Sequence, residues 1–242
     1  MDTKSNNAFY AIGALFLAAG ISVGGYFIGN MMYKSKVATN IATVRGLAER
    51  EVKADIAAWN VNFEASDVNL SAAYDAANSS REKVIAFIKE QGFAEADVTP
   101  SPLTVYKRED RDNAGKLLAT IYQIGGGVAV RSADVDKVAA SSQKVDELVK
   151  QGVLISSSYP QYYYTKLNDI KPEMLGEATR NARTAAEQFA KDANAKVGAI
   201  NNAGQGAFTL SPRDSGESQG DDTSSMHKKV RVVTTISFYL ER

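Results

Sequence analysis

The chain has 242 residues, and its 28 basic and 28 acidic side chains give a formal net charge of zero. This balance excludes the basic patch or stripe of a nucleic-acid surface, so we expect no nucleic-acid partner. The absence of cysteine excludes thiolate catalysis, disulfides and cysteine-bound zinc.

The first predicted element is a single apolar helix at the N-terminus. From Ser5 to Tyr33 the chain contains no Asp, Glu, Lys or Arg, and the most apolar part covers residues 8–28. A helix needs roughly 20 apolar residues to cross a membrane. A cleavable signal peptide is the alternative, but such a peptide has a basic leader and a shorter apolar run. We therefore predict an uncleaved membrane anchor over residues 1–36 that contacts lipid through residues 8–28.

The anchor also carries a pattern for helix packing. Pairs of small residues spaced four apart allow two membrane helices to approach closely. Two such pairs are present, formed by Gly20 with Gly24 and by Gly25 with Gly29. The flanking charges bear on orientation, because Lys34, Lys36 and Arg45 follow the span and only Lys4 precedes it with the terminal amine. By the positive-inside rule alone, the large domain is cytoplasmic.

After the anchor, the hydrophobic period switches repeatedly between that of a strand and that of a helix. The predicted order is strand, helix, strand, strand, helix, strand. This is the split β-α-β order of ferredoxin-like folds, which place two helices on one face of a four-stranded antiparallel sheet. The helices end at Gly92 and Gly152, Ser132 caps the second, and a charged hairpin tip, KREDRDNAGK, joins the middle strands. The strands are expected over residues 52–64, 98–106, 118–131 and 153–165.

A third helix and two strands extend this core, giving an α+β domain over residues 37–242. The helix is long and Ala-rich, is expected over residues 170–195 and has Pro172 at its start. The two strands cover residues 196–210 and 229–240. Both alternating faces of the second consist of residues that favour strands, so we expect it in the centre of a sheet. The segment 211–226 between them is rich in Ser, Gly and Asp and is expected to be a flexible loop.

The third helix offers one candidate surface for self-association. Its apolar stripe is built mostly from alanine, which lets another backbone approach closely. The stripe packs either on the chain's own sheet or against a neighbouring subunit. Its members are Leu175, Ala178, Ala182, Ala185 and Phe189.

The tyrosines Tyr162, Tyr163 and Tyr164 form the second candidate surface. Consecutive strand residues point to opposite faces, so at least one ring lies outside the main core. Tyrosine combines apolar area with a polar group and suits a subunit or ligand contact, although packing under the third helix is the alternative.

We find no pattern for catalysis, a cofactor or a metal. His227 is the only histidine, so no two-histidine metal site exists and no triad spacing is present. Gly125–Gly127 lacks the Lys-Ser/Thr of a phosphate loop and indicates a bulge or close backbone approach within a strand. Four acidic residues of the flexible loop could bind a hard cation, but their spacing is not that of an EF-hand. They are Asp214, Glu217, Asp221 and Asp222.

Three long stretches resemble the SIMPL-domain family. They are ATVRGLAEREVKADIAAWNVNF, YYYTKLNDIKPEMLGEATRNARTAAEQFAKDANAKVGAI and HKKVRVVTTISFYLER, and the resemblance runs from about Ile41 to Arg242. It implies a bacterial cell-envelope protein with β-α-β cores and a projecting helical part. It also implies closed homo-oligomers in some members and a link to oxidative stress in others, with no catalytic residue pattern. The domain would then lie on the periplasmic or exported side of the inner membrane, opposite to the charge count.

These observations predict a single-pass, membrane-anchored and non-enzymatic envelope protein that assembles with itself into a ring or cage. The alternative is an envelope binding module that uses the strand of Tyr162–Tyr164 for a small ligand or protein partner.

Overall fold

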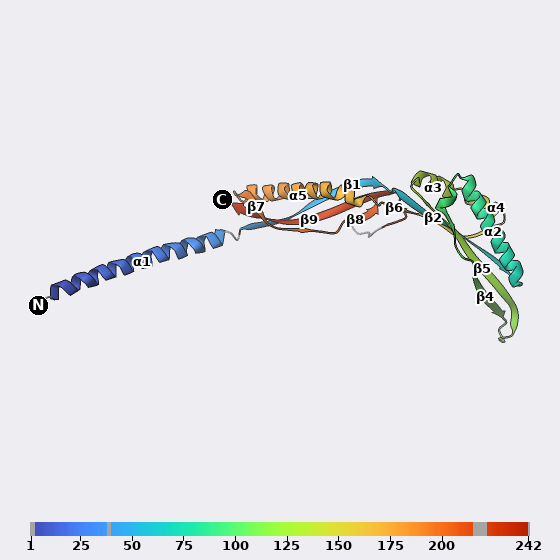
Figure 1. The fold of residues 1–242 in the computed structure, drawn as a ribbon, viewed down its shortest axis with the longest axis horizontal. Helices are drawn as coiled ribbons and strands as arrows, with labels where there is room; N and C mark the ends of the chain where they lie inside the picture. The colour runs from blue at the N-terminus through green and yellow to red at the C-terminus, as the bar shows by residue number, and fades with distance from the viewer. Residues whose placement is uncertain (1–2, 38–39, 215–221, 242) are drawn as a thin grey trace. The chain divides into compact units, whose positions relative to one another are not determined.

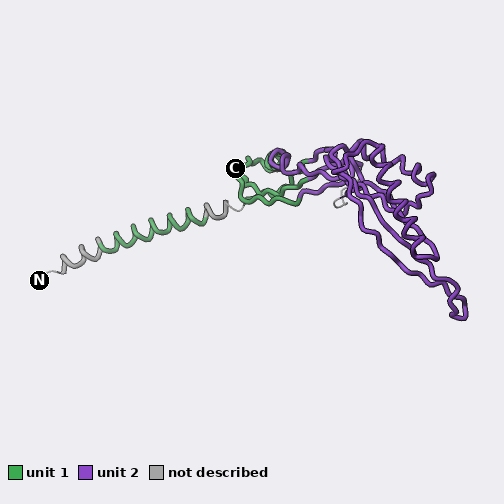
Figure 2. The backbone as a smooth tube through the Cα atoms, turned by 45° about the vertical axis from the view of Figure 1, so that its right-hand side comes forward, with its two compact units in different colours: residues 1–48, 175–207, 232–242 green, residues 49–174, 208–231 purple. Residues whose placement is uncertain are grey.

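The computed structural model describes residues 3–37, 40–214 and 222–241 (Figure 1). Helices and antiparallel strands follow one another after an N-terminal helix, which confirms the α+β class. The chain forms two compact units (Figure 2). Unit 1 comprises residues 1–48, 175–207 and 232–242, and unit 2 comprises residues 49–174 and 208–231.

Helix α1 (Thr3–Val37) is the predicted apolar helix. Its segment Gly13–Met32 is long and apolar enough to cross a membrane, and none of it is buried within the chain. Large apolar side chains are exposed all along this segment. Six of them are 64–77% exposed: Phe16, Ile21, Tyr26, Phe27, Ile28 and Met31. A helix that is apolar on every side is typical of a segment surrounded by lipid. Both a membrane anchor and a signal sequence present such a helix.

Unit 2 is built on a five-stranded antiparallel sheet. The order β3-β5-β2-β6, with β4 beside β5, confirms the ferredoxin-like arrangement. Helices α2 and α3 pack on one face of this sheet, together with the short α4, and leave the other face open (Figure 1). The bounds are β2 (Ile56–Asp67), α2 (Leu70–Glu90), η1 (Glu95–Asp97), β3 (Val98–Pro100), β4 (Thr104–Arg111), β5 (Leu117–Ser132), α3 (Val135–Ser142), α4 (Asp146–Lys150) and β6 (Leu154–Tyr163).

Aromatic side chains fill the core of unit 2. Trp59 and Phe63 alternate along β2 with polar residues and are at most 1% exposed, because every second strand residue faces the helices. The Trp59 ring meets Phe87 of α2 edge to face, with the ring centroids 6.4 Å apart. The indole Nε1 donates to Ser158 Oγ at 2.9 Å, so the buried polar atom is satisfied.

The helix ends of unit 2 follow local chemistry. Asn69 caps α2 by accepting from the backbone N of Ser71 at 2.9 Å. Gly92 and Gly152, the predicted stops, have φ of 82° and 81°, where glycine is favoured. The expectation that Ser132 caps the next helix is wrong. Ser132 ends β5 and its Oγ accepts from the N of Asp134, whose carboxylate is the true cap.

Several predicted boundaries differ in unit 2. The predicted strand 98–106 is divided into β3 and β4 by residues 101–103. Ser101 directly follows β3, and its N–H still donates to Gly127 O at 2.8 Å. The charged segment KREDRDNAGK, residues 107–116, was expected to form a hairpin tip. Its first half belongs to β4, which continues to Arg111, and only residues 112–116 form the turn. The second predicted helix is interrupted after Ser142 and gives α3 and α4.

Unit 1 is built around the last strand. In its sheet the order is β1-β9-β7, with β1 (Ile41–Lys53), β7 (Lys196–Gln205) and β9 (His227–Glu241), while β8 (Thr209–Pro212) pairs with β9 within unit 2. This confirms the predicted central position of the strand. From Val232 to Phe238 the even-numbered residues are buried. The predicted strand 196–210 is divided into β7 and β8.

Helix α5 (Leu167–Asp192) covers one face of the unit 1 sheet at very short range. A Cβ added at Gly46 of β1 would lie 1.8 Å from Ala178 O and 2.7 Å from Ala182 N. Asn181 Nδ2 also donates to Leu47 O at 2.7 Å. The alanines and the glycine thus allow the helix backbone to rest directly on the strand.

The bounds of α5 correct the prediction of 170–195. The helix starts at Leu167, so Pro172 lies inside it rather than at its first position. Proline has no backbone N–H, so the helical bond to the carbonyl of Asn168 is missing. Both predicted ends, 170 and 195, lie three residues closer to the C-terminus than the observed ends, Leu167 and Asp192.

Candidate functional site

The predicted apolar stripe of α5 is divided by the structure. Ala178 and Ala182 are fully buried, with Gly46 of β1 beside them, while Phe189 is 62% exposed. Leu175 and Ala185 are half-buried. The buried residues are spaced four apart, so the buried line shares only Ala178 and Ala182 with the predicted stripe. Its members are Met174, Ala178, Ala182, Ala186 and Ala190. Packing on the chain's own sheet therefore accounts for the alanines, and Phe189 is the member that is open to a neighbour.

The three tyrosines lie at the end of β6 and just after it. Tyr162 is 6% exposed and belongs to the core of unit 2, while Tyr163 and Tyr164 are half-buried. Burial raises the pKa of Tyr162, helped by the charge of Asp136. Burial also raises the pKa of Tyr164, with Asp55 as the next cause. Tyr163 Oη donates to Gln161 Oε1 at 2.7 Å.

The four glycines of α1 are open to contact. Within the chain, nothing lies within 4 Å of the position that a Cβ would take at Gly20, Gly24, Gly25 or Gly29. Their role in packing against another membrane helix stays a prediction.

Strand β7 is an unprotected sheet edge, which the sequence did not reveal. It lies at the end of the order β1-β9-β7, and every residue from Ala199 to Gln205 is exposed. No charged residue and no proline occur between Val197 and Gln205. A flat edge of unpaired N–H and C=O groups pairs readily with another strand, which natural proteins prevent with charges, prolines or bulges. In β7, Lys196 at the start and the register shifts on both sides of Ile200 serve that purpose, and the regularly paired segment from Asn202 to Gln205 has neither.

The edge strands β4 and β6 of the unit 2 sheet are protected. Strand β4 carries a row of ion pairs, with Glu109 Oε1 2.7 Å from Lys107 Nζ and Glu109 Oε2 2.7 Å from Arg111 Nη2. Hydrogen bonds from these two cations lower the pKa of Glu109. Strand β6 contains Pro160, and the N–H of Tyr162 donates to the carbonyl of Thr223 at 2.7 Å. The remaining edge strand of the unit 1 sheet, β1, carries Arg45 within unit 1, and its other charged residues lie in the part of the strand that belongs to unit 2.

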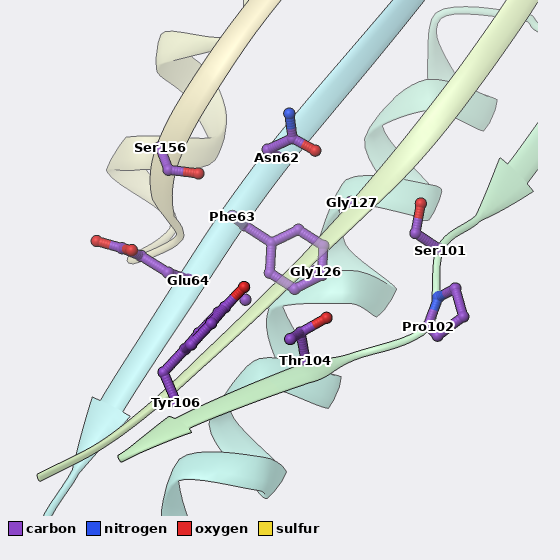
Figure 3. Close-up of a pocket in the computed structure, with 11 residues that line it drawn as sticks. Asn62, Phe63, Glu64, Ser101, Pro102, Thr104, Tyr106, Gly126, Gly127 and Ser156 are labelled. Atoms are coloured by element: carbon purple, nitrogen blue, oxygen red, sulfur yellow. The ribbon is translucent and has the colours of Figure 1, made fainter. Parts of the chain in front are cut away.

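A groove of about 360 Å³ lies on the open face of the unit 2 sheet (Figure 3). Its floor is the glycine run, which pairs with β2 in the register Asn62↔Gly127, Phe63↔Gly126 and Glu64↔Gly125. The Phe63 ring occupies the helix side of Gly126, so a Cβ there would lie 2.8 Å from Phe63 Cζ. This confirms close approach within a strand. On the open side, Gly125 leaves the backbone bare, whereas the side-chain amide of Asn62 lies against Gly127.

Polar groups form the walls of this groove. On the β2 side, Gln123 Nε2 donates to Glu64 Oε2 at 2.6 Å, and Asn62 Nδ2 donates to Ser157 Oγ at 2.8 Å. The second carboxylate oxygen of Glu64 and the amide oxygen of Asn62 are left as acceptors. On the other side stand Ser101, Thr104 and the 62% exposed Tyr106, whose ring lies between β4 and β2 in Figure 3.

The remaining chemical candidates do not come together. Glu217 and Asp221 of the predicted flexible loop 211–226 lie outside the described residues. Asp222, at the end of that loop, is held in place by hydrogen bonds. Its carboxylate accepts from Ser224 N, Ser224 Oγ and Ser225 N. Its backbone carbonyl accepts from Lys228 Nζ. Partial burial raises the pKa of Asp222, but these hydrogen bonds outweigh it and lower the pKa. In the described part of the chain, no three His, Cys, Asp or Glu side chains gather as metal ligands. His227 begins β9 and is exposed.

The groove residues were missed by the sequence reasoning. The sequence places Asn62 and Glu64 within the expected strand 52–64 and Tyr106 at the end of the expected strand 98–106, and it assigns no site to them. The signal was present in the glycine run, since three glycines in a central strand remove the side chains that normally cover a sheet face.

The fold and these surfaces define an α+β protein with an N-terminal apolar helix and a ferredoxin-like sheet. The chain belongs to the SIMPL family, described as "Protein of unknown function (DUF541)", whose model matches residues 42–238. No curated protein matches the chain. Among solved structures, it is similar to one described as "Crystal structure of a hydrolase from Listeria innocua". The identity is 14%, the match covers 76% of this chain and 90% of that chain, and the TM-score is 0.20, which carries no functional argument.

Proposed function

We propose that this SIMPL protein is a membrane-anchored, non-enzymatic protein of the cell envelope that assembles with itself into a closed homo-oligomer. The observation that carries the proposal is the exposed edge of β7, which is uncharged from Val197 to Gln205. Two copies that pair through this edge would bury the same surface on both partners, as in an isologous dimer.

A second contact would turn such dimers into a ring or cage. The pairs Gly20/Gly24 and Gly25/Gly29 supply a candidate in the membrane, and they are open within the chain. Anchoring every copy in one bilayer raises the effective concentration of the edges, which favours assembly through a weak contact.

The domain lies on the exported side of the inner membrane in this proposal. The support is family membership together with one span close to the N-terminus. The charge bias of Lys34, Lys36 and Arg45 favours the opposite orientation. The chain has no cysteine, so one cysteine placed at the exposed Ala76 of α2 reports the side directly. A membrane-impermeant thiol reagent labels Ala76→Cys in intact spheroplasts if the domain is exported; labelling only after lysis contradicts this orientation.

Assembly is tested by the mass of the detergent-extracted particle, measured by light scattering. The proposal requires a multiple of the 26.0 kDa chain mass. The double variant Asn201→Lys/Ala203→Lys, which places two like charges on the β7 edge, should reduce the particle, because lysines on an edge oppose strand pairing. Ala76→Lys/Ser79→Lys adds the same charge to the exposed face of α2 and should leave the mass unchanged. A monomeric wild type defeats the proposal.

A further inference from the structure

We propose that the groove over Gly125 and Gly127 binds a saccharide, with one or two uncharged sugar rings lying flat on the glycine floor. This binding function is separate from assembly, because the groove lies within unit 2 and the β7 edge within unit 1. It also places ligand binding at a different site from the tyrosines Tyr162–Tyr164.

The shape of the groove comes from missing side chains. Gly125 and Gly127 both face the open side of the sheet. Gly125 has no atom closer than 4.0 Å to the position of an added Cβ, whereas the amide oxygen of Asn62 lies against Gly127. A flat ligand can therefore contact the strand backbone directly at Gly125, with the Asn62 amide beside it. The volume of about 360 Å³ is at the lower end of the range for small-molecule sites, about 300–1,000 Å³.

The charge of the walls selects against anions. The eleven lining residues include no Lys, Arg or His, and one of them is the carboxylate Glu64. A phosphate or carboxylate ligand would meet this negative charge without a cation to pair with it. A cationic amine is the competing ligand, because the neutral donor Gln123 and the other neutral lining residues leave the charge of Glu64 uncompensated.

The polar atoms suit a ligand that carries many hydroxyl groups. Asn62 Oδ1 and the second oxygen of Glu64 accept hydrogen bonds, since their partners Ser157 and Gln123 use other atoms. Four hydroxyls, of Ser101, Thr104, Tyr106 and Ser156, can donate or accept. Adjacent sugar hydroxyls present the same mixture of donors and acceptors.

Tyr106 provides the apolar part of the site. Its ring is largely exposed and stands between β4 and β2 over the glycine strand (Figure 3). Exposed aromatic faces bury apolar C–H surface well, and one face of a sugar ring is largely C–H. The groove thus combines a flat floor, an aromatic wall and neutral hydrogen-bonding groups.

The test uses the full chain in a detergent without a sugar headgroup. Trimers of N-acetylglucosamine, glucose in α-1,4 linkage and glucose in β-1,4 linkage are titrated by calorimetry, with spermidine and inorganic phosphate as the cationic and anionic comparisons. We expect at least one trisaccharide to bind with a Kd of about 1 mM, and neither charged probe to do so. Absence of saccharide binding at about 10 mM, or binding of a charged probe alone, overturns the proposal.

Two variants locate the binding. Tyr106→Ala should weaken the saccharide about tenfold, whereas Tyr159→Ala removes an 82% exposed tyrosine from the same face outside the groove and should change nothing. Gly125→Ala adds a methyl group to the floor with no clash in the chain, so the fold should persist while binding is lost. Binding that is unaffected by both Tyr106→Ala and Gly125→Ala contradicts the assignment.

Discussion

The two sheets of this protein treat their edges differently. The unit 2 sheet ends in strands protected by ion pairs, as at Lys107–Glu109, or by Pro160. The unit 1 sheet ends in β7, which is exposed from Ala199 to Gln205 and uncharged there. The cores differ as well, because unit 2 is filled by large aromatic side chains, whereas in unit 1 the alanines of α5 pack on Val44, Ile236 and Phe238. The difference teaches that charge and proline close the β4 and β6 edges of unit 2, whereas β7 presents backbone groups with which another strand could pair.

The largest effect on stability is expected in the aromatic core of unit 2. Trp59 is fully buried, contacts Phe87 and donates to Ser158 Oγ. Trp59→Ala should lower the free energy of unfolding by about 3–5 kcal/mol, measured by chemical denaturation. Tyr159→Ala, on the same sheet but exposed, should change it by less than about 0.5 kcal/mol. Equal effects of the two variants would contradict the described core.

A smaller but still large effect is expected where α5 meets β1. Gly46→Ala places a methyl group against the backbone of Ala178, which cannot rotate away as a side chain does. We expect a loss of about 2–3 kcal/mol, seen as a lower thermal midpoint. Gly204→Ala in β7 is the control, because its nearest contact would be an ordinary 3.8 Å to Thr235 O. A neutral Gly46→Ala would show that the helix does not lie this close.

A modest, pH-dependent effect is expected at Asp55, between β1 and β2. Partial burial raises its pKa, but hydrogen bonds from Thr165 N and Oγ1, both 2.8 Å, outweigh this and lower it below 3.8. A lowered carboxyl pKa stabilises the fold above pH 3.8, and this contribution is lost as the pH falls through the folded-state pKa. Asp55→Asn should cost about 0.5 kcal/mol at pH 7 after solvent screening.

The pH series supplies the control for that prediction. The difference between wild type and Asp55→Asn should shrink when unfolding is measured below pH 3.8. A difference that stays constant with pH would mean that the charge of Asp55 contributes nothing.

The smallest effect on stability is expected at the unprotected edge. Asn201→Lys/Ala203→Lys changes only exposed side chains, so unfolding should shift by less than about 0.5 kcal/mol per site. The same variant is the one expected to lose assembly. A large loss of stability would indicate instead that these residues support the unit 1 sheet itself.

Much of the fold could be predicted because its signals are local. The alternation of Trp59, Val61 and Phe63 marks a half-buried strand, and Gly92 and Gly152 mark helix ends through their positive φ. The start of α5 was predicted too late for two reasons. Lys166, which directly precedes the helix, is not a typical N-cap residue, and proline is common at the first position of a helix, so Pro172 was taken as the start. The partner of its stripe was left open, because alanine suits both an internal and an external contact.

The surfaces were harder to predict, because they depend on which strands become neighbours. Nothing in VGAINNAGQ distinguishes an edge strand from an internal one; only the pairing order shows that β7 has one neighbour. Likewise, Tyr106 and Glu64 are 42 positions apart and meet only because β4 and β2 both flank β5. The glycine run was noticed, but its bare face became a groove only with those neighbours.

Cross-linking through β7 in native membranes tests the central claim most directly. Because the natural chain has no cysteine, Ala203→Cys and, as the matched control, Ala76→Cys each carry a single thiol on an exposed residue. A short bifunctional thiol reagent should convert Ala203→Cys to a covalent dimer on a denaturing gel and leave Ala76→Cys monomeric. A monomeric Ala203→Cys, or dimers in equal amount from both variants, would contradict assembly through the β7 edge.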